Sequence, residues 1–139
     1  MVNKRNTIIV AEMGINHGGS LDIAKQLIDI CSDLNIPYVK FQKRDIVSCY
    51  LKEFLDSYRE SPFGQTQRAQ KEGLEFSLEQ YKEIDNYCKE KGNIKWFASP
   101  WDVQSIAFLE SNFSDIPYLK IPSAKVTDET FLNRCKESK

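Results

Sequence analysis

The sequence predicts an α/β fold: the first half, about four βα units, of a (β/α)8 TIM-type barrel. Short apolar runs that suit buried strands alternate with longer segments whose apolar residues recur at helical spacing. The expected strands are apolar on both faces, as in a parallel sheet that helices cover. Polar residues suited to ligand binding follow every strand. This favours the top of a barrel over an open sheet, where such residues gather at one switch point.

The first strand–helix unit occupies residues 7–35. TIIVAE at 7–12 is a continuous apolar run typical of a buried strand, and MGINHGG at 13–19 is a glycine-containing loop. In residues 20–35, apolar side chains recur at helical spacing behind Ser20, whose hydroxyl can cap the first turn. The order is therefore strand, loop and helix.

A long polar insertion interrupts the second unit. PYVKFQ at 37–42 is rich in strand-forming residues, and its proline stands first, where a strand needs no ladder N–H. Residues 43–76 form the insertion, in the loop after the second strand, with a short helix expected within SCYLKEFLDSY. Ser77 begins a capping-box pattern for the next helix, which Gly92 ends. The insertion is either a substrate lid or a solvated surface loop.

Two further units complete the expected half-barrel. IKWFAS at 94–99 is the third strand and residues 102–113 are the third helix. PYLKI at 117–121 is the fourth strand, and residues 127–138 begin the fourth helix. Four units make half of an eight-stranded barrel, so residues 1–139 are expected to be the truncated N-terminal portion of a longer barrel, with two unpaired sheet edges.

Composition narrows the class of protein. The chain has 139 residues, 41% of them hydrophobic and 28% charged, as in one soluble globular domain. Its formal net charge of −1 leaves no basic surplus, so neither nucleic acid nor a membrane is expected as a partner. The apolar run near the N-terminus is too short for a signal peptide, and no stretch approaches the ~20 apolar residues of a membrane span. A cytoplasmic location is expected.

A repeated hexapeptide carries the strongest functional signal. Ile-Pro-Tyr-aliphatic-Lys-apolar occurs at 36–41 and again at 116–121, so Lys40 and Lys120 occupy equivalent places in two strands. Because a desolvated, unpaired ammonium group costs several kcal/mol, each lysine must reach water or face an anion. The recurrence favours two ammonium groups that converge, near Ser99, on a phosphate or carboxylate.

Other candidate residues allow two interpretations each. Glu12 ends the first strand, where its carboxylate either acts on a substrate or pairs with the lysines. Ser99 either contacts an anion or, with Asp102, forms a capping box. The loop at 13–19 has neither G-x-G-x-x-G nor Walker A spacing. His17 is the only histidine, and the four cysteines are scattered without a C-x-x-C pair, so a loop or substrate role for His17 is favoured over a metal site.

At this point the chain resembles the N-acetylneuraminate (sialic acid) synthase family. The segments IIVAEMGINHGGSLDIAKQLID, VKFQ, GLEF, FASPWD and YLKIPSA occur in the order and spacing of that family and span nearly all of the chain. The resemblance implies the N-terminal part of a catalytic barrel. In the full-length parent, that barrel condenses phosphoenolpyruvate with N-acetylmannosamine or a diacetamido relative, giving a nonulosonic (sialic-type) acid and phosphate.

The resemblance also implies residue roles and partners. It gives catalytic roles to Glu12 and Lys40. It gives substrate binding to Asn16, Lys40, Gln42, Ser99, Lys120 and Ser123. A divalent metal, Mn²⁺ or Mg²⁺, and a homodimer are implied for the full-length parent, with the metal ligands outside this chain. The isolated chain is therefore expected to be inactive or nearly so.

Two alternatives stay open. One is a class I aldolase, in which a buried lysine of lowered pKa forms a Schiff base with the substrate. The other is a folding or assembly module that has no catalytic function and binds nothing by itself.

Overall fold

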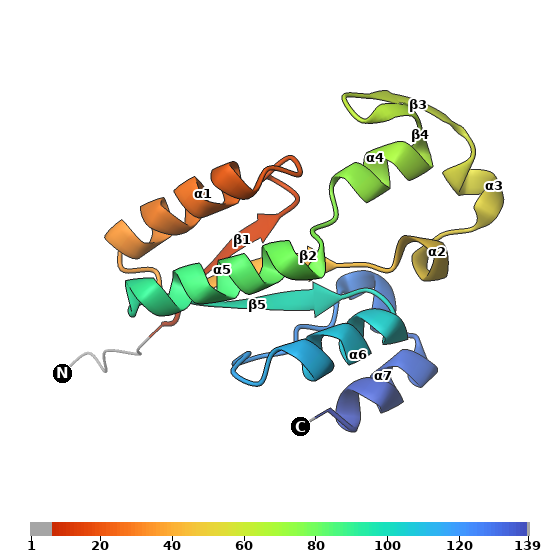
Figure 1. The fold of residues 1–139 in the computed structure, drawn as a ribbon. Coiled ribbons are helices and arrows are strands. Elements are labelled where there is room, and N and C mark those ends of the chain that lie inside the picture. The colour runs from red at the N-terminus through yellow and green to blue at the C-terminus, as the bar shows by residue number, and fades with distance from the viewer. Residues whose placement is uncertain (1–6, 139) are drawn as a thin grey trace.

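The core of the fold is a three-stranded parallel sheet, as seen in a computed structural model that describes residues 7–138 (Figure 1). The strands β1 (Val10–Gly14), β2 (Tyr38–Lys43) and β5 (Lys95–Pro100) lie in the order β1-β2-β5. Helix α1 (Leu21–Asp33) connects β1 to β2, and α5 (Leu78–Lys91) leads into β5. The prediction of an α/β fold with a parallel sheet is confirmed.

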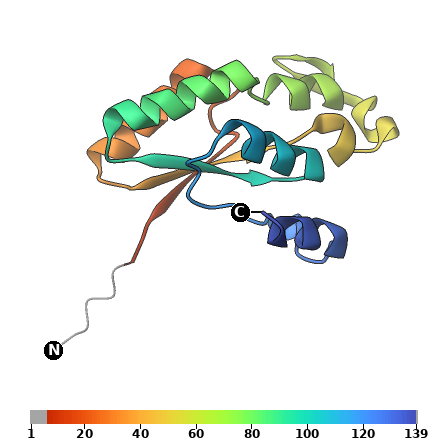
Figure 2. The ribbon, with the colours of Figure 1, turned by 60° about the horizontal axis from the view of Figure 1, so that its bottom comes forward.

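The two faces of the sheet differ sharply. Val39 and Phe41 of β2, with Trp96 and Ala98 of β5, are buried in one core with apolar residues of α1 and α5. Figure 2 views the sheet close to edge-on, with α1 and α5 together on one side of it. Because side chains alternate along a strand, Lys40 and its neighbours of the same parity lie on the opposite face, which we call the inner face.

Both long helices begin and end as their sequences predict. The Ser20 hydroxyl accepts a hydrogen bond from the backbone N–H of Ile23 at 3.3 Å. Ser77 and Gln80 form a reciprocal capping box at the start of α5, and Gly92 ends that helix with φ +76°, a left-handed conformation that glycine adopts without strain. These caps satisfy backbone groups that would otherwise have no partner.

The insertion is a folded unit that projects beyond the carboxyl end of β2 (Figure 1). It contains three helices and a two-stranded antiparallel hairpin: α2 (Ile46–Cys49), α3 (Lys52–Leu55), β3 (Tyr58–Ser61), β4 (Gly64–Thr66) and α4 (Gln67–Gly73). The sequence indicated one short helix there and missed the hairpin. Its turn forms because Gly64 takes φ +141°, and the Ser61 hydroxyl donates to the Gly64 carbonyl at 2.9 Å.

One carboxylate ties the two ends of the insertion together. Glu75, at the exit, accepts a charged hydrogen bond from Nε of Arg44, at the entry, over 2.6 Å. Lys43 lies 3.5 Å from the same carboxylate, and the side chains of Arg44 and Glu75 are only 8% and 10% exposed. The two ends of the insertion, one after β2 and one before α5, therefore lie next to each other.

The two outer strands are shorter than expected. β1 begins at Val10 instead of residue 7, and Ile8 and Ile9 are 59% and 57% exposed, so the apolar run there is not fully buried. Residues 117–121 form one parallel bridge, between Leu119 and Ala98, instead of a full strand. Each of these two segments has a described neighbouring strand on one side only. At the ends of the second segment, Pro117 and Pro122 also have no N–H group to donate to a neighbouring strand.

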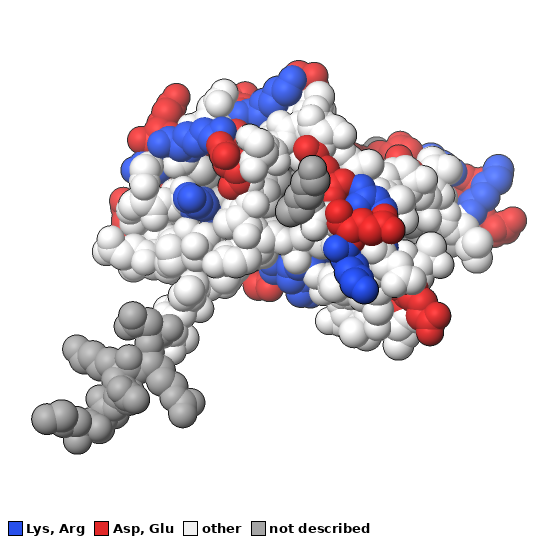
Figure 3. All heavy atoms as spheres, turned by 90° about the horizontal axis from the view of Figure 1, so that it is seen from below, with Lys and Arg blue, Asp and Glu red and all other residues white. Residues whose placement is uncertain are grey.

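The C-terminal region otherwise follows the predicted order. It contains α6 (Val103–Asn112), a 3₁₀ turn (Ser123–Lys125) and α7 (Glu129–Lys136). The N-cap of α6 is Asp102, so the capping interpretation of Ser99 is wrong. Within residues 7–138, no helix combines the length and apolarity that crossing a membrane requires. Figure 3 shows one face of the molecule, where basic and acidic groups lie next to each other and much of the surface is uncharged.

Candidate anion-binding site

Lys40 is a buried ammonium group on the inner face of the sheet. It is 4% exposed, although a lysine is seldom buried without a partner. Its Nζ lies 2.7 Å from Oε2 of Glu12 on β1 and donates to Oγ of Ser99 on β5 at 3.3 Å. The structure therefore brings three of the predicted site residues, from three different strands, into direct contact.

The strand register places the other predicted lysine beside this group. Gln42 pairs with Ser99, and the bridge between Ala98 and Leu119 makes Lys120 the next residue along that segment. Lys120 therefore has the parity of the inner face, and its backbone lies two strands from that of β2, about 10 Å away. Lys120 is half-buried, whereas Ser123 is exposed in the 3₁₀ turn beyond it. Among the described contacts, none joins Ser123 to Lys40.

The β1–α1 loop holds the remaining predicted residues. Asn16 is exposed, and its Nδ2 donates a long hydrogen bond of 3.5 Å to the backbone carbonyl of Glu12. Gly14, with φ +54°, passes close to Gln42, whose Nε2 would lie 3.5 Å from a Cβ at that glycine. Asn16 and Gln42 thus flank the Lys40 group without contacting its ammonium.

The ion pair at Lys40 is asymmetric. The Lys40 side chain is 5% exposed, whereas that of Glu12 is 65% exposed. The carboxylate can therefore turn into water at little cost, but the buried ammonium group would then be left desolvated and without its charge partner. An incoming phosphate or carboxylate can replace Glu12 beside Lys40, with the Ser99 hydroxyl as a second donor.

His17 has a structural role in the loop. It is 3% exposed, and its ring stacks on Phe76 with 4.1 Å between centroids. Its Nδ1 accepts a hydrogen bond from the backbone N–H of Gly19 at 3.1 Å, so the ring is held as the neutral form. Burial lowers the pKa of His17 to about 4, the charge of Arg44 acts in the same direction, and a hydrogen bond with the Gly14 backbone opposes them.

This His17 environment predicts a pH-dependent stability. Because the folded pKa of about 4 lies below the ordinary value of 6.5, the unfolded chain binds more protons between these limits. The contribution of neutral His17 to the free energy of unfolding is complete above about pH 6.5. It is lost as the pH falls toward 4, and the total loss is up to about 3 kcal/mol. Urea unfolding at pH 7 and pH 4.5 measures it, with His17→Gln as the control that does not titrate. Equal losses in both proteins would contradict the prediction.

Two buried polar residues, Tyr81 and Asp102, form hydrogen bonds near the ends of β2 and β5. The sequence did not indicate that either one supports the site. Tyr81 on α5 is almost fully buried, and its hydroxyl donates to the backbone carbonyl of Gln42 at 2.9 Å. Asp102, 5% exposed, accepts from the backbone N–H groups of Asp45 at 2.8 Å and Ser105 at 2.7 Å. Asp102 has a sequence signal, its position before a helix, whereas the Tyr81 contact has none.

The Asp102 carboxylate also binds two side chains. The Ser105 hydroxyl donates to it at 2.8 Å, and Sγ of Cys49 lies at 3.1 Å. Burial and the nearby Asp102 raise the pKa of the Cys49 thiol, so the sulfur stays protonated and donates. Asp102 therefore joins α2 of the insertion to the start of α6, immediately after the strand that carries Ser99.

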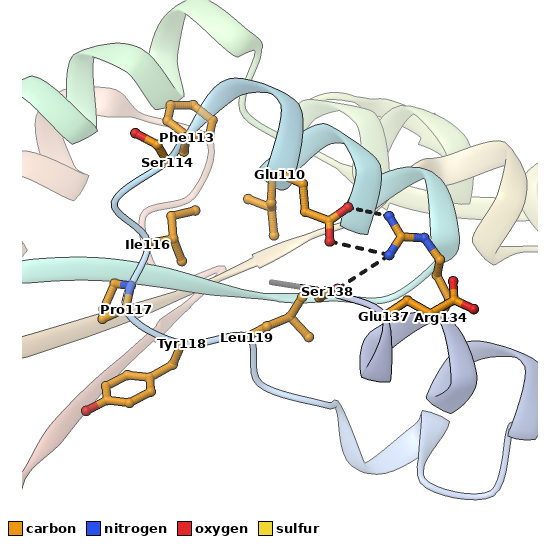
Figure 4. Close-up of a pocket in the computed structure, with 11 residues that line it drawn as sticks. Glu110, Phe113, Ser114, Ile116, Pro117, Tyr118, Leu119, Arg134, Glu137 and Ser138 are labelled. Carbon is orange, nitrogen blue, oxygen red and sulfur yellow. Dashed lines mark hydrogen bonds and ion pairs between the residues drawn. The ribbon is translucent and has the colours of Figure 1, made fainter.

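A separate cavity lies away from the Lys40 group. It has a volume of about 550 Å³ and lies between α6, the segment 114–119 and the end of α7 (Figure 4). Apolar residues line much of it, and its charged residues are Glu110, Arg134 and Glu137, of which Glu110 and Arg134 bind each other. Leu119 lines this cavity, whereas Lys120, of opposite parity, faces the inner side. The one basic residue of the lining is already paired with a carboxylate, so the Lys40 group is the better candidate site for an anion.

The metal that the resemblance implies finds no ligand set here. Among residues 7–138, no three or more His, Cys, Asp or Glu side chains are grouped so that they could hold a metal ion.

Comparison with known proteins decides the family. The model of the NeuB family matches residues 27–139, which is most of the chain. This chain belongs to the NeuB family. The strand-end residues Lys40, Ser99 and Lys120 all lie within the matched region, and Glu12 lies before it.

Other NeuB-type proteins are similar over nearly all of this chain but are much longer. The N,N'-diacetyllegionaminic acid synthase of Campylobacter jejuni is 32% identical over 133 residues, covering 94% of this chain and 39% of that protein. The human N-acetylneuraminate-9-phosphate synthase is 32% identical over 128 residues, covering 91% of this chain and 35% of that protein. The NeuB-family chain thus spans less than two fifths of these relatives.

Solved structures show the same fold. The N-acetylneuraminic acid synthetase of Leptospira borgpetersenii, solved in complex with citrate, superposes with a TM-score of 0.74 at 28% identity. The match covers 96% of this chain and 42% of that one. A putative spore coat polysaccharide biosynthesis protein of Chromobacterium violaceum gives a TM-score of 0.73 at 22% identity, which supports the fold alone.

Proposed function

We propose that this chain supplies the phosphoenolpyruvate-binding part of a nonulosonic acid synthase. The whole protein would condense phosphoenolpyruvate with an N-acetylated amino sugar, and residues 1–139 would form the first half of its barrel. The observation that carries the proposal is Lys40, an ammonium group buried on the inner face of β2, 2.7 Å from the exposed carboxylate of Glu12 and 3.3 Å from the hydroxyl of Ser99, near the carboxyl end of β5. Catalytic groups of barrels lie at this end of the strands.

In this proposal, Lys40 and Ser99 bind the anionic groups of phosphoenolpyruvate, and Lys120 adds positive charge from the neighbouring segment. The enol carbon attacks the sugar aldehyde, water adds to the resulting oxocarbenium carbon, and the C–O bond to phosphate breaks. Cations fixed beforehand around the phosphate stabilise the charge on the leaving group. Glu12, displaced from Lys40 by the anion, contacts a sugar hydroxyl or accepts a proton.

Calorimetry with phosphoenolpyruvate tests the binding role directly. We expect heat of binding at millimolar ligand, because the Lys40 group is already assembled in this chain. Absence of binding would favour the folding or assembly module instead. Borohydride reduction that links a substrate covalently to Lys40 or Lys120 would favour the aldolase alternative.

Replacing Glu12 tests the competition at Lys40. The Glu12→Gln variant lacks the carboxylate that pairs with the Lys40 ammonium group. Phosphoenolpyruvate should therefore bind to this variant severalfold more tightly than it binds to the unsubstituted chain. Calorimetric titration of both proteins measures the change. Weaker binding to Glu12→Gln would mean that Glu12 assists the anion instead of competing with it.

The resemblance also supports three proposals about the whole protein: a homodimer, a divalent metal held by residues outside this chain, and a cytoplasmic location. The relatives' names cover two product classes, a sialic acid 9-phosphate and a diacetylated legionaminic acid. The amino sugar is therefore proposed only as N-acetylmannosamine or a related N-acetylated sugar, phosphorylated or not.

A further inference from the structure

The tip of the β3–β4 hairpin packs against the end of α4 and against the β1–α1 loop. The ring of Phe63, at the tip, fills the space beside Gly73, the last residue of α4, so a Cβ added at Gly73 would overlap the ring. A Cβ added at Gly19, in the β1–α1 loop, would lie 3.2 Å from Cζ of Phe63 and would overlap the Gly73 carbonyl oxygen. Hairpin, helix end and loop therefore meet at one closely packed point, which we call the Phe63 contact.

The two glycines allow this close approach for different reasons. Gly19 has φ +78°, a left-handed conformation that strains most other residues. Gly73 has no positive φ and lies in a helix, where alanine is normally favoured over glycine. The backbone at 73 would therefore accept alanine, and the ring of Phe63 is what requires glycine there.

The Phe63 contact holds a loop that carries a predicted substrate-binding residue. The backbone N–H of Gly19 donates to Nδ1 of His17 at 3.1 Å, and the His17 ring stacks on Phe76 with 4.1 Å between centroids. The insertion thus holds the loop at two neighbouring places, by Phe63 at Gly19 and by Phe76 at His17. Asn16 is adjacent to His17 and exposed, so its position depends on how the loop is held.

We propose that Phe63 is a positioning residue, whose ring holds the β1–α1 loop against the insertion and so fixes Asn16 beside the Lys40 group. The purpose of the contact rests on the proposed function, in which residues of this loop bind the substrate. The contact itself does not depend on that function. The insertion then supports the loop, a role that a solvated surface loop could not fill.

Amide hydrogen exchange tests the contact. In Phe63→Ala, the backbone amides of Asn16 and Gly19 should exchange about 10-fold faster while those in the middle of α1 keep their rates, because the loop opens locally. Phe54→Ala is the matched control, since Phe54 has the same exposed fraction, 40%, but stacks on another ring within the insertion. It should leave the loop amides within about twofold. Equal acceleration in both variants, or none in Phe63→Ala, would overturn the proposal.

The imidazole of His17 gives a signal specific to the loop. His17 is the only histidine in the chain, so its nuclear magnetic resonance signal identifies itself. With a pKa of about 4, it should barely titrate between about pH 5 and 7 in the unsubstituted chain. In Phe63→Ala, release of Gly19 admits water to the ring, and its pKa should rise toward the ordinary value of 6.5. A general loss of stability would not move this signal in folded protein, and an unchanged titration in Phe63→Ala would contradict the positioning role.

Gly73→Ala tests the contact from the opposite side. It should accelerate exchange of the loop amides about 10-fold by displacing the Phe63 ring, although alanine normally stabilises a helix. The double variant should exchange within about twofold of Phe63→Ala, because the ring that the new methyl group would displace is already gone. Effects that multiply would show that the two substitutions act at separate places and would reject the contact. Circular dichroism verifies that each variant is folded.

Calorimetry with phosphoenolpyruvate separates this inference from the proposed function. Lys40 and Ser99 lie on β2 and β5, not on the loop that Phe63 holds, so Phe63→Ala should keep the affinity within about twofold. Absence of binding to both proteins would reject the proposed function, while the exchange rates would still decide the contact itself. Binding lost only in Phe63→Ala would show that the ring supports the strands instead of the loop, which would overturn its assigned role.

Discussion

Replacing Lys40 with methionine should weaken phosphoenolpyruvate binding by about 10- to 100-fold, the range expected when a buried charged hydrogen-bond donor is removed. The methionine keeps most of the side-chain length, so the inner face should stay packed. Glu12 loses its partner but is 65% exposed and returns to water at little cost. Calorimetry at neutral pH measures the affinity, and urea unfolding verifies that the variant is folded.

Lys95 provides the matched control for Lys40. It lies on β5 with the inner-face parity, but it pairs with Tyr38, at the opposite end of the strands from Ser99. Lys95→Met removes the same charge from the same face and should leave the affinity within about twofold, because exposed charges at that distance are screened. Equal effects of the two substitutions would show that only the overall charge matters and would remove Lys40 from its proposed role.

Replacing Asp102 with alanine should lower the free energy of unfolding by about 2–4 kcal/mol, as for a lost helix cap plus buried donors left unsatisfied. Two backbone N–H groups, of Asp45 and Ser105, would lose their acceptor. Urea unfolding followed by circular dichroism measures the loss. Asp102→Asn, which keeps one acceptor oxygen, should lose less.

Asp128 is the control for the Asp102 effect. It caps α7 by accepting from the backbone N–H of Phe131 at 3.0 Å, but its side chain is 37% exposed and lacks the buried network. Asp128→Ala should therefore cost only about 1 kcal/mol, the usual value of an N-cap. If both substitutions cost the same, the contacts of Asp102 with the insertion contribute nothing to stability.

Local patterns predicted the central elements well and the peripheral ones less well. β2 lies between β1 and β5, and β5 lies between β2 and the bridge to Leu119. Their apolar residues are therefore buried as the pattern indicates. The segments at 7–9 and 117–121 have the same apolar character, but each has a described neighbour on one side only. A strand needs a partner for its hydrogen bonds, and no sequence pattern states which partner is present.

The site was predicted in part, for a similar reason. Lys40 stood out because a lysine interrupts a buried strand, and Glu12 and Ser99 stood out because each ends a predicted strand, although β1 in fact continues to Gly14. The choice between a role on the substrate and pairing with a lysine could not be made for Glu12 from the sequence, because it depends on a distance, and the structure gives 2.7 Å to Lys40. The sequence around Asp102 predicts a capping box, but no local pattern indicates its contacts with Asp45 and Cys49, more than fifty positions away.

The ion pair between Arg44 and Glu75 bears on whether the insertion can be removed or replaced by protein engineering. Because the two ends of the insertion meet, closing the gap left by its removal would need only a short linker and a small loss of chain entropy. A replacement for residues 45–74 could therefore be joined at the same two ends, provided that it supplies donors in place of the Asp45 and Cys49 contacts with Asp102.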